Sequence, residues 1–207
     1  MIKVNMNATR QELLKLKNRL KMAKRGHKLL KDKRDELMKE FLELIRKDKD
    51  LREEVEKALR SAYQSFLVAR AVLSSAVLEE SFMAPKQEIS LEVSTRGVMS
   101  VSVPEFKVTT QGESIGYGFA NTSSELDDAV SDYSRVLPMM VELAAVEKAV
   151  DLLSEEIEKT RRRVNALEYV LIPELEAAVK DIGMRLSEIE RSNASRLMKI
   201  KDIVRAH

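Results

Sequence analysis

"ELLKLKNRLKMAKRGHKLLKDKRDELMKEFLEL", Glu12 to Leu44, repeats apolar residues every seven positions. One column of the repeat contains Leu16, Ala23, Leu30, Leu37, Leu44, Leu51, Ala58, Ser65 and Val72. The other contains Leu13, Leu20, His27, Arg34, Phe41, Asp48, Val55, Ala62 and Ala69. A seven-residue repeat of this length is typical of a left-handed coiled coil. It predicts one helix from about Thr9 to Glu80, and Thr9 with Glu12 forms a capping box at its start.

The last third of the chain repeats this pattern. Ser124, with Asp127 three residues later, predicts a helix start. The apolar seam contains Leu143, Val146, Val150, Leu153, Ile157, Thr160, Val164, Leu167 and Leu171. It resumes at Leu175, only four residues after Leu171, which indicates a stutter that locally unwinds the supercoil. Pro173 lies inside this stutter, where it disturbs the helix least.

The segment between the two helices predicts a β-hairpin. Apolar residues alternate with polar ones at Ile89, Leu91, Val93, Val101 and Val103. The predicted turn spans residues 94–97, Pro104 closes the hairpin, and a loop rich in Gly, Ser and Thr follows. A lone hairpin is marginally stable in water, so its apolar face must be covered. The helix ends near Phe66, Val77 and Phe82 are candidates to cover it.

The sequence therefore predicts a mainly α fold, a long antiparallel two-helix coiled coil with a small β-hairpin insert at the turn end. Residues 1–80 and 122–207 form the coiled coil, and residues 81–121 form the hairpin and loop at the tip opposite both termini. Charged residues make up 34% of the chain and aromatics 4%, which suits a coiled coil better than a globular core. No apolar stretch is long enough to predict a membrane-spanning helix.

Motifs for catalysis are missing from the sequence. The glycines at positions 112, 116 and 118 lack the spacing and the lysine of a phosphate-binding loop. The two histidines and the scattered carboxylates predict no metal site and no cofactor, and His27 lies at a seam position, where a structural role is expected. We interpret the chain as a mechanical or scaffolding protein and not as an enzyme.

Charge is unevenly distributed along the chain, although the net charge is only +2. The first 34 residues contain twelve Lys or Arg against Glu12 and Asp32, whereas residues 81–130 carry a net charge of −4. The basic end leaves a nucleic-acid-binding coiled coil as one alternative function. The absence of interleaved aromatic residues and the acidic middle argue against it. A free coiled-coil tether or chaperone-like arm is a second alternative.

Three adjacent arginines lie beside the seam of the last helix. Arg161 and Arg163 flank the seam positions, whereas Arg162 points outward, four residues after Glu158, with which it can form an ion pair. If Leu13 lies opposite Ile203, the acidic stretch near Glu53 faces Arg163. The row is then either a solvated, partly neutralised edge or a contact surface.

Two stretches of the sequence resemble a known family. "NATRQELLKLKNRLKMAKRGHKLLKDKRDELM" and "EEIEKTRRRVNALEYVLIP" are similar to the two ends of the D subunit of V-type and archaeal-type rotary ATPases, nearest to the bacterial V-type form. The resemblance covers essentially the whole chain. Its hallmark blocks are Asn7, Thr9-Arg10, Arg25-Gly26, Leu29-Leu30-Lys31, Lys33-Arg34-Asp35 and residues 162–168. Ala8 replaces a proline frequent in the family, which affects only the entry to the helix.

The resemblance implies a non-catalytic central rotor shaft, cytoplasmic and peripheral to the cell membrane. Its termini enter the bore of a ring of A and B subunits, and its hairpin end lies toward the membrane, beside the F subunit and a d/C-type subunit. The shaft couples ATP hydrolysis or synthesis to H⁺ or Na⁺ transport, without nucleic acid and without inserting into the membrane. Candidate ring contacts are Arg161, Arg162, Arg163, Arg25 and Arg34. Candidates for contact with the F subunit, or for coupling, are Ile89, Leu91, Val93, Val101 and Val103.

Because the sequence has no phosphate-binding loop, we expect the isolated chain neither to bind nor to hydrolyse ATP. Isothermal titration calorimetry of the pure protein with Mg-ATP checks this expectation. Stoichiometric heat of binding would contradict the non-catalytic interpretation.

Overall fold

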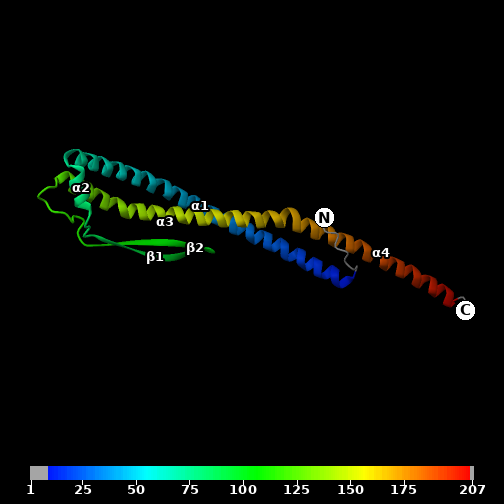
Figure 1. Cartoon of the computed structure of the whole chain (residues 1–207). Coiled ribbons are helices and arrows are strands. Elements are labelled where there is room, and N and C mark those ends of the chain that lie inside the picture. Colours follow the sequence, from blue (N-terminus) through cyan, green and yellow to red (C-terminus); the bar gives the residue numbers. More distant parts are fainter. Residues whose placement is uncertain (1–8, 206–207) are drawn as a thin grey trace. The chain divides into compact units, whose positions relative to one another are not determined.

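The computed structural model describes residues 9–205, so the hallmark positions Asn7 and Ala8 lie outside the described residues. Its elements are α1 (Arg10–Val72), α2 (Ser75–Phe82), β1 (Glu88–Val98), β2 (Val101–Gln111), α3 (Ser124–Ala166), the π turn η1 (Leu167–Leu171) and α4 (Ile172–Arg205) (Figure 1). The prediction of a mainly α fold with one small hairpin is confirmed. None of the described helices is long and apolar enough to cross a membrane.

The chain divides into two compact units. The helical unit comprises the chain up to Glu36 together with the chain from Glu158 onward, and the hairpin unit comprises Leu37–Ile157. The hairpin therefore belongs to the same unit as the middle of the helical chain. That the hairpin end lies toward the membrane stays a prediction.

The start of α1 is confirmed by its cap. The Glu12 amide donates to the Thr9 hydroxyl oxygen at 3.2 Å, which satisfies one of the amide groups that a helix start leaves free. The predicted end at Glu80 is wrong, because α1 stops at Val72 and a short α2 follows. Ser74 adopts an extended conformation (ψ 152°), and its side chain accepts a hydrogen bond from the Val77 amide. Ser74, as a potential helix cap, was the sequence signal for a new helix start, and the apolar repeat that continues through it obscured this signal.

In the helical unit, α1 and α4 pack in antiparallel order. Arg10 pairs with Glu190 at 2.6 Å and Lys24 pairs with Glu176 at 2.6 Å, so residue numbers fall along α4 as they rise along α1. The seam residues Leu16, Thr160, Val164 and Ile182 are buried, as predicted. Ion pairs this exposed contribute little to stability, so the buried seam holds the helices together.

In the hairpin unit, α1 and α3 pair in the same antiparallel order. Fully buried Leu37 packs with Leu153 and Ile157. Further along α1, Ser65 donates to Asp132 at 2.9 Å, and Ala69 packs with Leu126 and with Leu78 of α2. Buried seam positions shift from one predicted column, at Leu37, to the other, at Val55, Ala62 and Ala69. An ideal α-helix drifts relative to a strict seven-residue repeat, which accounts for this change of column.

The hairpin is longer than predicted, because its turn lies at Met99 and Ser100 and not at residues 94–97. The register pairs Val93 with Phe106 and Leu91 with Val108, which places apolar side chains opposite one another. Met99 has a positive φ of 55°, a conformation uncommon outside glycine. Pairing of these apolar residues, and not the glycine at 97, determines where the chain turns.

Pro104 lies within β2, opposite Thr95, so the prediction that it ends the hairpin is wrong. Both strands of a two-stranded sheet are edges, and an edge strand tolerates a residue without an N–H group. Helix α3 also contains a proline, Pro138, within its predicted helical segment. The helix continues through it, although Ser134 loses the amide partner of its carbonyl group.

The predicted stutter near Pro173 appears as a π turn. Residues 167–171 form this turn, and the Ile172 amide donates to the Leu167 carbonyl group. Leu171, a predicted seam residue, is exposed, and half-buried Ile172 takes its place. The phase change was therefore located correctly, but the structure accommodates it as one additional residue.

The cluster of Leu37, Leu153 and Ile157 generates a stability prediction. We expect Leu153→Ala to lower the free energy of unfolding by about 2–5 kcal/mol, because truncating a fully buried leucine leaves a cavity. Leu42→Ala, at an exposed position of α1, is the matched control and should cost well under about 1 kcal/mol. Urea denaturation followed by circular dichroism measures both, and equal losses would show that this cluster is not the core.

Candidate functional site

The arginine row lies in the last turns of α3. Val164, between the arginines and the π turn, is buried, whereas all three arginines are exposed. Arg162 forms the expected ion pair with Glu158. Within the described part of the chain, neither Arg161 nor Arg163 forms an ion pair, and both guanidinium groups are open to a partner.

The predicted register that placed Arg163 opposite Glu53 is wrong. Arg10 lies opposite Glu190, whereas that register required Leu13 to face Ile203. Glu53 belongs to the hairpin unit, where its neighbour Arg52 pairs with Glu147. The Arg52–Glu147 pair places this part of α1 beside a part of α3 that precedes the arginine row in the sequence. The error arose because the seam was assumed to start and end with the helices, whereas α4 extends well beyond the start of α1.

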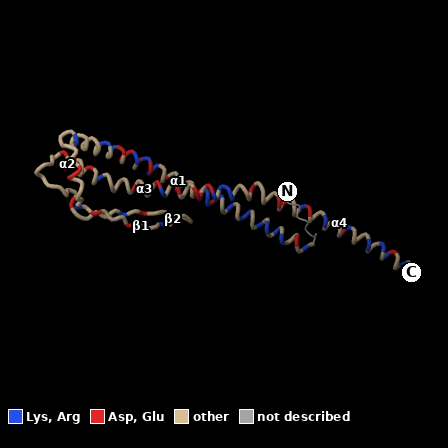
Figure 2. Tube along the Cα trace, viewed as in Figure 1, with Lys and Arg blue, Asp and Glu red and all other residues tan. Residues whose placement is uncertain are grey.

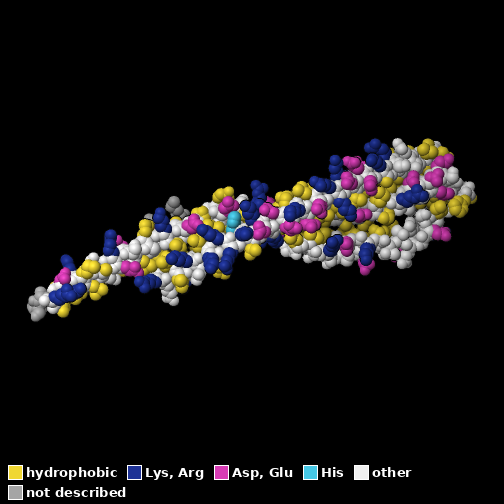
Figure 3. Space-filling model, turned by 180° about the vertical axis from the view of Figure 1, so that it is seen from behind, with side chains coloured by type: hydrophobic (Ala, Val, Ile, Leu, Met, Phe, Trp, Pro, Cys, Tyr) yellow, Lys and Arg dark blue, Asp and Glu magenta, His cyan; other side chains and the backbone are white. Residues whose placement is uncertain are grey.

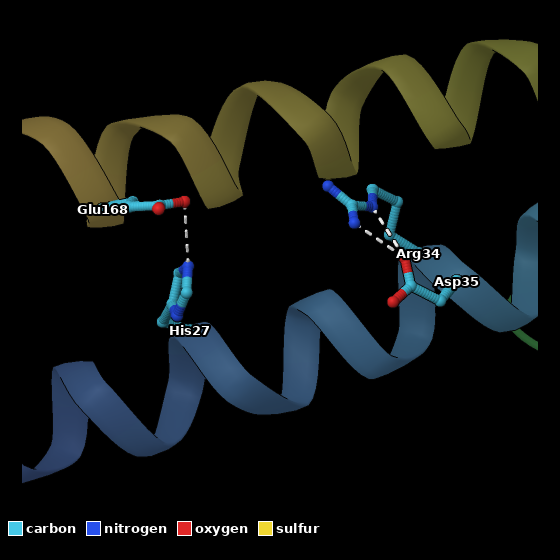
Figure 4. Close-up of polar contacts among 4 residues, drawn as sticks. All are labelled: His27, Arg34, Asp35 and Glu168. Atoms are coloured by element: carbon cyan, nitrogen blue, oxygen red, sulfur yellow. Dashed lines mark hydrogen bonds and ion pairs between the residues drawn. The ribbon is translucent and has the colours of Figure 1, made fainter.

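Arg34 differs from the other candidate arginines. Its side chain is half-buried, and its Nε and Nη2 atoms donate to Asp35 Oδ1 at 3.0 and 2.7 Å. In Figure 4 it extends toward the facing helical segment. Because Asp35 already offsets its charge, Arg34 offers less attraction to a partner than Arg161 or Arg163 does.

His27 faces the π turn from α1. Its Nε2 atom lies 3.3 Å from Glu168 Oε2, and the ring is half-buried (Figure 4). This contact joins two helices of the helical unit across the seam. The structural role predicted for His27 is consistent with this position, because the ring lies between the two helices.

Arg25 belongs to a basic groove on α1. A shallow hollow of ≈ 410 Å³ is lined by Lys17, Leu20, Lys21, Lys24, Arg25 and Lys28. Of these side chains only Lys24 forms an ion pair with another described residue, Glu176. Figure 2 shows the concentration of Lys and Arg along this part of α1. Only Arg25 of this groove was predicted as a contact, although spacings of three and four residues place all these cations on one helix face.

The hairpin candidates do not share one face. Ile89, Leu91 and Val93 of β1 lie on the face that also carries Phe106 and Val108, as the register requires. Val101 and Val103 lie on the opposite face, paired with Val98 and Arg96. Phe106 and Val108 were missed, because Pro104 was taken as the end of the hairpin, although the apolar alternation continues beyond it.

The two faces have different surroundings. Val98 and Val101, beside the turn, pack against the cluster of Leu37, Leu153 and Ile157. Near the open end, Ile89 and Thr110 line a cavity of ≈ 310 Å³ together with Phe66, Phe82 and Tyr133, among other residues. Of the three helix-end residues predicted to cover the hairpin, Phe66 and Phe82 lie there, and Val77 is not in the lining. The hairpin therefore rests on its own helices.

Part of the apolar face stays open despite this packing. Ile89, Leu91 and Val93 are 48%, 52% and 59% exposed. Figure 3 likewise shows hydrophobic side chains among charged ones on the molecular surface. Packing against the chain's own helices does not account for three apolar residues along one face of β1. This face is therefore a candidate contact surface.

The loop between β2 and α3 is attached through Tyr117. Its hydroxyl donates to Asp127 Oδ1 at 2.7 Å, and burial together with this hydrogen bond raises the pKa of Tyr117 well above its usual range. At the start of α3, hydrogen bonds with its own amide and with Ser123 lower the pKa of Glu125. The Tyr117–Asp127 hydrogen bond holds the loop against the helix start. No group of His, Asp or Glu side chains within residues 9–205 is arranged to hold a metal ion.

Comparisons with known proteins agree with this architecture. The family model for the D subunit of ATP synthase matches residues 12–202. The V-type ATP synthase D subunit of Acetivibrio thermocellus is 58% identical over 205 residues, covering 97% of this chain and 92% of the relative. The proteins of the same name from Clostridium novyi and Thermoanaerobacter pseudethanolicus are 50% and 53% identical, with 99% of this chain covered and 97% and 99% of the relatives. The chain therefore belongs to the family of ATP synthase D subunits.

Proposed function

We propose that this chain is the non-catalytic central rotor shaft of a V/A-type rotary ATPase. It couples ATP hydrolysis or synthesis at a ring of A and B subunits to H⁺ or Na⁺ transport across the membrane. Its other partners are the F subunit and a d/C-type subunit that links it to the membrane rotor. The observation that carries this proposal is the match to relatives named as V-type ATP synthase D subunits over nearly the whole chain.

The paired helices suit a shaft. Each unit is held by a narrow buried seam, which leaves most of the helix surface facing outward. Two antiparallel helices present dissimilar faces to the subunits of a surrounding ring, as a rotor that acts on them in turn requires. Charged side chains are dispersed along the helices, so contacts can slide as the shaft turns (Figure 2).

The cations that have no ion-pair partner among the described residues suit the ring contact. Arg161, Arg163 and the basic groove around Arg25 belong to the helical unit, which holds both chain ends. Attraction between charges falls gradually with distance and survives small displacements, unlike close apolar packing. The helical unit therefore enters the ring, and its basic surface attracts acidic ring residues.

Assembly with the ring tests the proposal directly. We expect this chain, mixed with purified A and B subunits, to form a complex with one copy per ring, and to recruit the F subunit. A nucleic-acid binder or a free tether would form no such fixed stoichiometry. Size-exclusion chromatography with native mass spectrometry measures the stoichiometry.

The arginine row yields a mutational prediction. Arg161→Ala, Arg162→Ala and Arg163→Ala combined should leave the helical circular dichroism nearly unchanged, because exposed charges contribute little to folding. Ring affinity should fall about tenfold at low salt, since each exposed charge contributes about 0.5 kcal/mol. Surface plasmon resonance with the A–B ring at several salt concentrations measures this loss.

A matched variant controls for net charge. Arg46→Ala, Lys57→Ala and Arg60→Ala remove the same charge from exposed α1 positions in the hairpin unit and should leave ring affinity unchanged. If the two triple variants weaken binding equally, only net charge matters. If neither does, the arginine row is a solvated helix edge.

The open hairpin face yields a second prediction. Ile89→Thr, Leu91→Thr and Val93→Thr together keep residues that favour strands but remove apolar surface from this face. We expect ring entry to persist, whereas binding of the F subunit or the coupling of shaft rotation to ATP turnover should weaken. Pull-down with the F subunit and an ATPase assay of the reconstituted complex measure the two effects.

Replacing residues 88–111 with a flexible linker is the stronger version of this test. Normal binding of the F subunit and normal ATP turnover in both variants would make the hairpin a passive spacer. Loss of ring entry would mean that the hairpin unit, and not the helical unit, makes the ring contact.

A further inference from the structure

The π turn contains one residue more than the seam on either side requires. Seam residues Thr160 and Val164 precede it, and half-buried Ile172 and Leu175 follow it. A π turn closes hydrogen bonds from residue i to i+5, so it holds an additional residue without rotating the helix that follows. The additional residue is therefore a local insertion into an otherwise regular seam.

The turn has few contacts that hold its shape. None of its five residues is buried, and Tyr169, Val170 and Leu171 are 72%, 53% and 43% exposed. Pro173 has no amide to donate, so the Tyr169 carbonyl group lacks its usual α-helical partner. Few buried contacts and an incomplete hydrogen-bond ladder are the features of a segment that opens easily.

The facing side of α1 leaves room for movement. Glu168 makes the polar contact across to α1, to His27 at the long distance of 3.3 Å. Gly26, beside His27, has open space where a Cβ atom would lie. The long contact from Glu168 and the missing side chain at Gly26 therefore give the turn little support from α1.

We infer that the π turn is a torsional joint in the shaft. The additional residue can pass from one helical turn to the next, so α4 can twist relative to the end of α3 while the seam stays paired on both sides. This inference rests on the proposed function, because a shaft that transmits torque is loaded in this direction. A strictly α-helical chain would resist the same twist with every bond of its ladder.

Two single-residue deletions separate a joint from an ordinary helical segment. Deleting Val170 removes the additional residue, so α4 should continue α3 as one α-helix with Leu175 and Ile182 still on the seam. Deleting Lys180, at an exposed position within regular α4, rotates every later residue by about 100° off the seam. The melting temperature should stay equal or rise without Val170 and fall by about 5 °C or more without Lys180.

Hydrogen exchange of the isolated chain measures the joint itself. Amides of residues 167–172 should exchange at least about tenfold faster than those of 176–182, and deletion of Val170 should abolish the difference. Equal exchange in the two segments of the parent chain would overturn the inference. So would melting of the Val170 deletion at a temperature as low as that of the Lys180 deletion.

Assembly with the ring then tests whether the joint is used. The chain lacking Val170 should enter the A–B ring like the parent but lower the ATPase rate of the complex several-fold. An unchanged rate in the assembled complex would overturn the functional joint. Failure of the parent chain to enter the ring would instead refute the proposed function, and the exchange measurement would still decide whether the π turn is mobile.

Discussion

The burial of one narrow apolar seam between antiparallel helices is the constraint on which the rest of this structure depends. Each long helix contributes roughly two residues per seven to the seam of its unit, and most of the buried residues lie on these seams. A small number of large residues, including Leu16, Leu37 and Leu153, is fully buried. The exposed positions outside the seam are free to carry charge. Stability and surface function are therefore assigned to different residues of the same helix.

The seam explains which irregularities the chain tolerates. Pro138 and Pro173 both lie in helices, and both are exposed, so each removes a backbone hydrogen bond without disturbing a buried contact. The break before α2 is likewise compensated locally, by the Ser74 cap. Thr160 is one exception, because its hydroxyl is buried on the seam without a hydrogen-bond partner among the described residues, at a cost of about 1–3 kcal/mol.

The sequence was sufficient to predict the long helices, their antiparallel pairing, many seam residues and the position of the phase change, because each leaves a periodic signal. The sequence was insufficient to predict features for which two local preferences, or two helix registers, compete. The hairpin turn lies at Met99, where the sequence contains no residue typical of a turn. The pairing of Val93 with Phe106 outweighs the turn preference of Gly97. The register of the helices could not be read from heptads, since shifting one helix by a full repeat leaves the apolar pattern unchanged. Ion pairs such as Lys24 with Glu176 distinguish the registers only once both helices are placed.

The corrected register changes the meaning of the charged surface. Arg161 and Arg163 have no ion-pair partner among the described residues, whereas Asp35 offsets part of the charge of Arg34. The candidate contacts thus fall into two classes that residue type alone could not separate. Arg25 gains importance for the opposite reason, since its lysine neighbours surround it with charge of the same sign. Like charges held together on one helix face repel one another, and an acidic partner relieves that repulsion. These uncompensated charges support the proposal that the basic surface contacts acidic residues of the ring.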